Sequence, residues 1–274
     1  MPLPGRKRRA LFRAYVWGRQ SIVQLARREQ RSHVWVKRQL DAARPVPRAL
    51  VPASAVVVAD MTFWGRGYGV CVFRDAISKQ NLWWKESLFE TPWVYGEGLA
   101  YLLERGWMIS AAVIDGKRGV AQVFERHGVP VQYCQFHQVK TVTKCLTRKP
   151  KTEAGQELRS LALTLKASDE AGFSERLAEW HEWWQSFLEE RSNAPGTKRG
   201  WQHTHRRVRA AYRSLKTNLT RLFTYERHPE LTIPKTTNTL DGMFSQIKNR
   251  LAVHRGLRRD RRYKLISEIL KTNN

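Results

Sequence analysis

The sequence has few cysteines, few acidic residues for its number of cations, and no long apolar stretch. Three cysteines in 274 residues do not make a disulfide framework, so a reducing, cytoplasmic setting is expected. The longest apolar runs, such as Ala55–Ala59 and Ser110–Ile114, are far too short to cross a bilayer, so no membrane partner is expected. The basic segment Met1–Arg9 lacks an apolar stretch, which argues against a secretory signal.

The scarcity of acids leaves a large excess of positive charge. There are 24 Asp and Glu against 49 Lys and Arg, a formal net charge of +25. Residues 1–48 hold 13 Lys or Arg and two acids, residues 191–216 hold eight and no acid, and residues 49–139 hold eight of each. Positive segments on both sides of a neutral block favour a nucleic acid that touches several parts of the protein. The alternative is a basic surface that only confers solubility or binds the ribosome.

The basic N-terminal segment has the pattern of three short helices. Leu11–Trp17 has helical apolar spacing, Ser21 can cap a helix over Ile22–Glu29, and Ser32 can cap a third. The last two, joined by a tight turn, are typical of a helix-turn-helix. The alternative is a basic helical hairpin that does not enter a DNA groove. On the third helix, the candidates for DNA contact are His33, Lys37 and Arg38.

After a stiff linker over Arg44–Arg48, whose two prolines end the preceding helix, the pattern changes to strands. Three strands in an antiparallel meander are followed by alternating helices and strands. The expected βββαβαβ order comprises Ala55–Phe63, Gly67–Ile77, Asn81–Phe89, Val94–Arg105, Ser110–Ile114, Val120–Arg126 and Val129–Tyr133. This order predicts an α/β fold, with a mixed five-stranded sheet and helices on its faces.

The second half of the chain reads as helical. Residues 138–228 repeat Leu and aromatic side chains at helical spacing and show no convincing strand, and a further helix is expected over Thr239–Leu251. Bases could stack on one tryptophan cluster, but its periodicity favours core packing. That cluster comprises Trp180, Trp183 and Trp184.

Two aspartates directly follow apolar runs of expected strands: Asp60 after Val56–Ala59, and Asp115 after Ala111–Ile114. A carboxylate is costly inside a sheet but accessible at its edge, and two that meet there repel unless a cation lies between them. Magnesium suits oxygen ligands, and two ions about 4 Å apart can activate the attacking oxygen and stabilise the leaving one in phosphodiester chemistry. The alternative is that both are turn or capping aspartates, since Asp-Gly is a common turn pair.

These motifs, taken in order, resemble the Mutator-like and related bacterial insertion-sequence transposases. The resemblance spans roughly residues 10–265, and its motifs are Val56–Asp60, Ala112–Gly116, the Cys134-x-x-His137 pair, a helical insertion and Thr236–Gly242. It implies an RNase H-like catalytic domain interrupted by an all-α insertion, with a third acid on the helix after it. That acid would be Asp241. The family usually has Glu there, whose side chain reaches about 1.5 Å further.

The resemblance implies a DNA transposase that hydrolyses phosphodiester bonds at insertion-sequence ends and then transfers the freed strand. Asp60, Asp115 and Asp241 would be its catalytic residues and would hold two Mg²⁺ or Mn²⁺ ions. Its partners would be double-stranded DNA of the transposon ends and the target, and further copies of the chain in a homo-oligomer. The expected location is the bacterial cytoplasm, at the nucleoid.

The same resemblance divides the chain into four parts. Residues 1–48 form the helix-turn-helix region with its linker, and 49–138 the first part of the catalytic core. Residues 139–232 form an all-helical insertion, and 233–274 a core helix with a basic tail. Within this division, the candidates for phosphate contact are Arg66, Lys248 and Arg255.

Alternatives exist at each level. The chain could be a decayed or repurposed transposase that binds DNA without cutting it, or a nuclease of this fold that does not transpose. Asn238 and Asp241 have the spacing of a helix cap with an acid at its third position, which needs no metal. Cys134 and His137 are zinc-ligand types without a second pair, so an architectural role is expected, with His137 near DNA.

Overall fold

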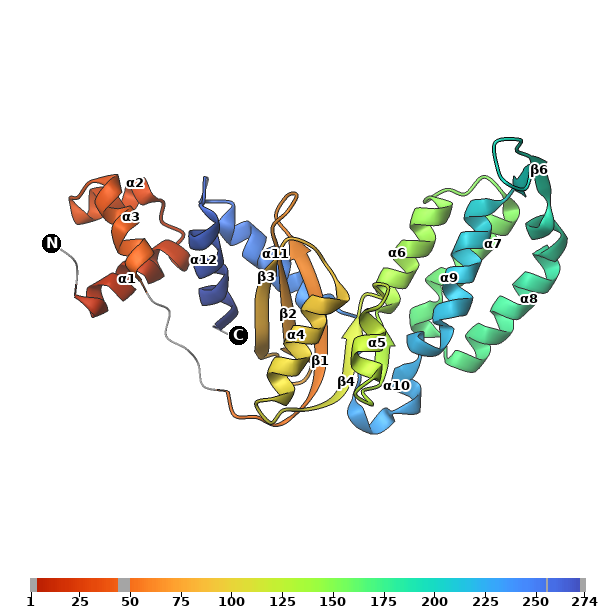
Figure 1. Ribbon diagram of the computed structural model, residues 1–274, viewed down its shortest axis with the longest axis horizontal. Coiled ribbons are helices and arrows are strands. Elements are labelled where there is room, and N and C mark those ends of the chain that lie inside the picture. Colours follow the sequence, from red (N-terminus) through yellow and green to blue (C-terminus); the bar gives the residue numbers. More distant parts are fainter. Residues whose placement is uncertain (1–3, 44–49, 255, 272–274) are drawn as a thin grey trace.

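The computed structural model describes residues 4–43, 50–254 and 256–271. The expected linker Arg44–Arg48 and the candidate phosphate contact Arg255 lie outside the described residues. The N-terminal helices lie at one end of an elongated molecule, a sheet lies in the middle, and a helical bundle lies at the other end (Figure 1). In the described part of the chain, no helix is both long and apolar enough to cross a bilayer.

The sheet has five strands in the order β3-β2-β1-β4-β5. The strands are β1 (Ser54–Phe63), β2 (Gly69–Asp75), β3 (Asn81–Ser87), β4 (Met108–Ile114) and β5 (Val131–Tyr133). The first three pair antiparallel, and the β1–β4 and β4–β5 pairs are parallel. The expected mixed sheet is confirmed, with strand ends displaced by up to two residues. The β1–β2 turn uses Gly65 and Gly67 at positive φ, a conformation that favours glycine.

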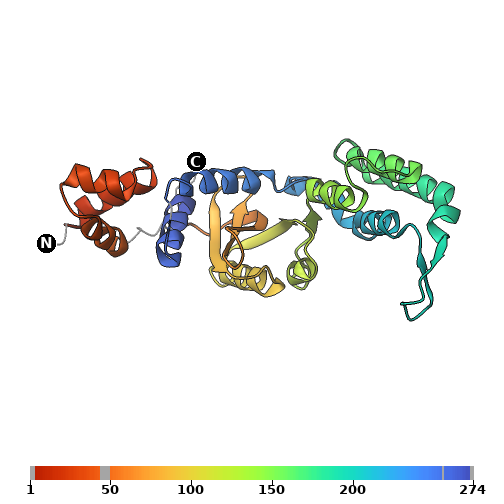
Figure 2. The same ribbon diagram turned by 90° about the horizontal axis from the view of Figure 1, so that it is seen from above.

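Helices cover both faces of this sheet (Figure 2). One face carries α4 (Pro92–Leu103) and α5 (Val120–Glu125), and the other carries α11 (Asn238–Leu251) and α12 (Arg259–Lys271). Side chains alternate along β1, so Val57 and Ala59 join the core beneath α4 and α5, while Val56 and Val58 join the core beneath α11 and α12. Asp60 shares the parity of Val56 and Val58, which points its side chain to the α11 face.

Three N-terminal helices form, as expected: α1 (Gly5–Val16), α2 (Ile22–Glu29) and α3 (His33–Ala42), although α1 begins six residues before the expected Leu11. Ser21 and Ser32 are the N-caps of α2 and α3, each accepting a backbone N–H at 3.2 Å. The turn between the two helices contains no glycine, and Gln30 takes the left-handed conformation there, with φ of 50°. A residue other than glycine can therefore close a tight helical turn, although at some conformational cost.

The segment after β5 is mainly a helical bundle. It comprises α6 (Gln135–Leu146), α7 (Glu153–Leu163), α8 (Glu170–Glu189), α9 (Arg206–Leu222), the short α10 (Thr224–Arg227) and the 3₁₀ turns Leu165–Ala167 and Pro229–Leu231. Trp180 is buried and its Nε1 donates to the Ala154 carbonyl, whereas Trp183 is 79% exposed. Core packing therefore explains Trp180 but not Trp183.

The expectation that this insertion is all-helical is wrong in one place. Strands β6 (Arg191–Asn193) and β7 (Trp201–His203) form an antiparallel hairpin between α8 and α9. Each strand has only three residues and no β-branched alternation, so the sequence carries no strand pattern there. Ala194–Gly196 lies in the turn of this hairpin.

Candidate metal centre

Asp60 and Asp115 meet at one edge of the sheet because β1 and β4 are parallel neighbours. The pairing of these strands extends to Val58 and Val113, and each aspartate lies two residues further along. Asp115 follows the end of β4, as expected. Asp60 does not follow a strand end, because antiparallel pairing with β2 continues β1 as far as Phe63. It lies inside β1, at the point where the contact with β4 stops.

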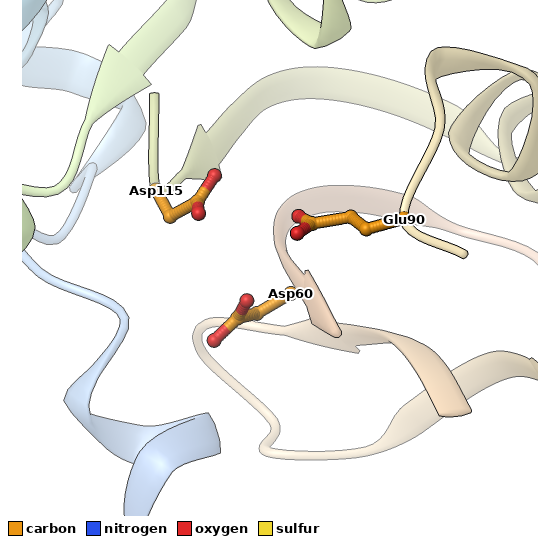
Figure 3. Close-up of side chains that lie close together, drawn as sticks. All are labelled: Asp60, Glu90 and Asp115. Carbon is orange, nitrogen blue, oxygen red and sulfur yellow. The ribbon is translucent and has the colours of Figure 1, made fainter. Parts of the chain in front are cut away.

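A third carboxylate, from Glu90, completes the cluster. One carboxylate oxygen from each of Asp60, Glu90 and Asp115 lies within 4.8 Å of the others (Figure 3). Glu90 comes from the loop between β3 and α4, where Tyr95 Oη donates to its Oε1 at 2.9 Å and Lys117 Nζ lies 3.7 Å from its Oε2. Glu90 is not among the site residues predicted from the sequence.

A signal for Glu90 was present in the sequence. The residue follows the third expected strand directly, as Asp115 follows the fourth. Because β1 and β2 pair antiparallel, and so do β2 and β3, β3 runs in the same direction as β1. Its carboxyl end therefore lies at the same edge of the sheet. Only the path of the loop between β3 and α4 brings the side chain to the other two acids.

Burial and the repulsion between neighbouring carboxylates both disfavour the ionised forms in this cluster. Asp60 is only 7% exposed. Burial, followed by the nearby Asp115, raises the pKa of Asp60 to about 7, although the Met61 N–H donates to its Oδ1 at 2.7 Å. Burial and Asp115 also raise the pKa of Glu90. Three ionised carboxylates at short range repel one another, and a bound cation relieves this repulsion. Their oxygen atoms are ligands that suit a hard divalent cation such as Mg²⁺ or Mn²⁺.

Asp241 lines the same open cavity, of about 570 Å³, but its carboxylate is not part of the three-residue cluster. It lies in the first turn of α11, where its Oδ2 accepts a hydrogen bond from Thr237 Oγ1 at 3.3 Å. The capping interpretation of Asn238 is wrong, because the N-cap is Thr237 and no side chain caps this helix. A role for Asp241 as a metal ligand stays a prediction.

Cys134 and His137 connect α6 to the start of α11. The Thr237 N–H donates to Cys134 Sγ at 3.3 Å, and the Thr237 hydroxyl lies 3.3 Å from His137 Nδ1. Burial raises the pKa of the Cys134 thiol, but hydrogen bonds with His137 and Thr237 outweigh it and lower the pKa overall. The hydrogen bond with Cys134 is the main cause that raises the pKa of His137 to about 9. These contacts agree with an architectural role, since they hold the helix that carries Asp241.

Cations surround the acidic cluster. Exposed Lys140 and Lys144, one turn apart on α6, line the cavity together with Lys248 and Ser245 of α11. Lys248 therefore shares a wall of the cavity with Asp241, as the helical spacing predicts. Arg66 is exposed in the β1–β2 turn, away from this lining. Carboxylates for a metal and lysines for phosphates thus occur in one cavity.

The helix-turn-helix candidates lie elsewhere. His33, Lys37 and Arg38 are exposed on α3 and line a separate cavity of about 530 Å³ with residues 256–258. Their position on one exposed side of α3 is compatible with groove entry. Their contact with DNA stays a prediction.

Comparison with known proteins returns no matching protein-family model and no matching curated protein. The chemistry of the cavity therefore rests on its own groups. These are three carboxylates that suit a hard cation, a fourth on α11, and three lysines that suit phosphates.

Proposed function

We propose that this chain is a DNA transposase with an RNase H-like catalytic domain, which cleaves phosphodiester bonds at transposon ends and joins the freed strand to target DNA. The observation that carries the proposal is the convergence of Asp60, Glu90 and Asp115 in a lysine-lined cavity. The order and directions of the five strands support the RNase H-like assignment.

The donor set fits divalent magnesium or manganese, because all of its ligand atoms are carboxylate oxygens. Asp60, Glu90 and Asp115 would hold one ion, and Asp241 on α11 is the candidate for completing a second site. When bound, such ions lower the pKa of a water molecule and stabilise the charge on the leaving oxygen.

The remaining groups bind and orient the DNA. Lys140 and Lys144 on α6 and Lys248 on α11 attract phosphates to the cavity, so the negative cluster does not repel the substrate. Thr237 fixes the first turn of α11 through its contacts with Cys134 and His137. The helix-turn-helix, on which His33, Lys37 and Arg38 are exposed, would recognise the terminal DNA.

The test is metal-dependent cleavage of duplexes taken from the DNA on both sides of the gene. We expect Asp60→Asn, Asp115→Asn and Glu90→Gln each to lower cleavage by at least about 100-fold, because each removes a ligand. Glu97→Gln is the matched control, since Glu97 pairs with Lys85 at the surface. Loss of activity in the control, or full activity in Glu90→Gln, would contradict the proposed site. Joined products would separate a transposase from a nuclease.

Asp241 is tested by two substitutions of opposite effect. We expect Asp241→Asn to lower cleavage, while Asp241→Glu extends the carboxylate by about 1.5 Å toward the cluster and raises it. Cleavage by Asp241→Asn at the wild-type rate would remove Asp241 from the ligand set. DNA binding by the wild type with no cleavage in either metal would favour the alternative, a decayed transposase that binds DNA without cutting it. The structural observation that favours this alternative is the position of Asp241 outside the three-carboxylate cluster.

A further inference from the structure

A cationic surface lies at the far end of the helical bundle, on the β6–β7 hairpin and the start of α9 (Figure 1). Residues 191–216 contain eight Lys or Arg and no acid. Several of these cations line a cavity of about 340 Å³, which the proposed reaction does not use. The hairpin surface is defined by Arg191, Arg199, Trp201, Arg206, Arg209 and Arg213.

Carboxylates do not neutralise this surface. Within the described ranges, no carboxylate lies at ion-pair distance from Arg199, Arg206 or Arg213. Glu190, at the base of the hairpin, is bound by His205 at 2.7 Å. Burial and the nearby Arg213 lower the pKa of Arg209, and the negative charge of Glu189 offsets them only in part. The hairpin surface therefore presents a net positive charge to solvent.

Two of these cations, Arg191 and Arg199, also contact Trp201 before any ligand binds. The guanidinium of Arg191 lies 4.0 Å from the ring centroid of Trp201, and that of Arg199 lies 5.8 Å from it. The Ala194 N–H donates to the Gly200 carbonyl at 2.8 Å and closes the hairpin. Side chains ordered in advance lose less conformational entropy on binding, so they favour a ligand more than mobile arginines would.

Helix α6 connects this surface to the acidic cavity. Lys140 and Lys144 of α6 line the cavity, and Arg207 at the start of α9 donates from Nη2 to the carbonyl of Lys144 at 3.0 Å. Helices α6 and α9 lie side by side in both views (Figures 1 and 2). A polyanion that enters the cavity and continues along α6 would reach the start of α9 and the hairpin.

We infer that the hairpin surface binds the phosphate backbone of duplex DNA beyond the stretch held at the acidic cavity. This inference rests on the proposed function, because it identifies the ligand as the continuation of the same DNA. Guanidinium groups spread over a helix and a hairpin can each pair with a phosphate of the duplex backbone, and phosphate contacts carry no sequence information. The contact is therefore independent of DNA sequence.

The test measures the affinity for a labelled duplex of arbitrary sequence, about 40 base pairs long, over a range of salt concentrations without divalent metal. We expect Arg206→Ala with Arg213→Ala to weaken binding about tenfold at low salt, and to reduce the slope of log Kd against log salt by about 2, or roughly 0.9 per lost phosphate contact. Arg206→Lys with Arg213→Lys should keep most of the slope, because both charges remain.

The matched control is Arg105→Ala with Arg126→Ala, two exposed cations at the ends of α4 and α5. The inference is overturned if the α9 variant keeps the wild-type slope, if the control loses as much, or if single-stranded DNA or RNA of the same length shows the same loss. Omitting the metal keeps this binding result separate from cleavage. A wild type that fails to cleave refutes the proposed reaction, and an unchanged slope refutes the hairpin contact.

Discussion

Asp60 combines two properties that seldom occur together in a stable protein: it is a buried carboxylate, and it has two other carboxylates at short range. Burial alone disfavours its ionised form, and Asp115 adds repulsion. Such a group contributes nothing to stability as an anion unless a cation is bound. The cost of keeping it indicates a role in binding rather than in folding, and active sites are where such perturbed groups concentrate.

At the residue scale, Asp60→Asn should stabilise the metal-free protein at high pH. The pKa of Asp60 is about 7 in the folded state and near 3.8 when unperturbed. Because the folded state holds its proton more tightly, this group's stabilising contribution is complete below pH 3.8 and is lost as the pH rises to 7. We expect a gain on the order of 2 kcal/mol at pH 8.

The measurement is urea unfolding in EDTA at pH 4 and pH 8, with Glu97→Gln as the control substitution. The gain should appear at pH 8 and shrink at pH 4. Added Mg²⁺ should then stabilise the wild type more than Asp60→Asn, because the variant lacks one ligand. An equal gain at both pH values would show that repulsion within the cluster is not its cause.

At the scale of the element, α2 shows how local chemistry sets a helix boundary. The Ser21 hydroxyl accepts the Gln24 N–H at 3.2 Å, while Gln24 Oε1 accepts the Ser21 N–H at 2.7 Å. This reciprocal pair satisfies two backbone donors that have no partner inside the helix. An eight-residue helix is too short to be stable alone, so its cap and its packing against α3 both matter.

Ser21→Ala should destabilise the N-terminal helices by about 1 kcal/mol, whereas Ser21→Gly should cost only a few tenths. Hydrogen exchange provides a local measurement, because the Gln24 amide loses its acceptor and should exchange faster in the alanine variant. The equivalent change at Ser32 should instead affect the Trp35 amide in α3. Unchanged exchange at Gln24 would mean that the cap does not hold this helix.

At the scale of the whole molecule, the N-terminal helices are connected to the C-terminal helix through a buried arginine. Arg261 of α12 makes a bidentate contact with Asp41 of α3, at 2.9 and 2.7 Å, and its side chain is 6% exposed. Asp41 remains 47% exposed. Because segments 220 residues apart meet here, this pair helps to set the position of the helix-turn-helix relative to the sheet.

The pair should respond asymmetrically to substitution. Asp41→Asn leaves a buried guanidinium without its counter-charge and should cost about 3 kcal/mol, whereas Arg261→Met leaves only a solvated aspartate and should cost less than about 1 kcal/mol. Chemical denaturation of the two variants checks the order. A larger loss in Arg261→Met would show that packing of the arginine, rather than its charge, holds the contact.

The sequence alone determined the elements whose signals are local. Alternating β-branched runs, serine caps and helical apolar spacing predicted all five strands of the sheet and the three N-terminal helices, because each depends on neighbours a few residues away. The same patterns placed Asp60 and Asp115 at the carboxyl edge. The β6–β7 hairpin was not predicted, because its strands are too short to show an alternation of apolar and polar residues.

Only the tertiary structure decided which acids share the site. Glu90 joins Asp60 and Asp115 because of the path of the loop after β3, and Asp241 stays outside the cluster because of where α11 packs on the sheet. Both outcomes depend on loop paths and helix docking, which carry no periodic signal. Local patterns set the strands, and long-range packing set the distances between their carboxylates.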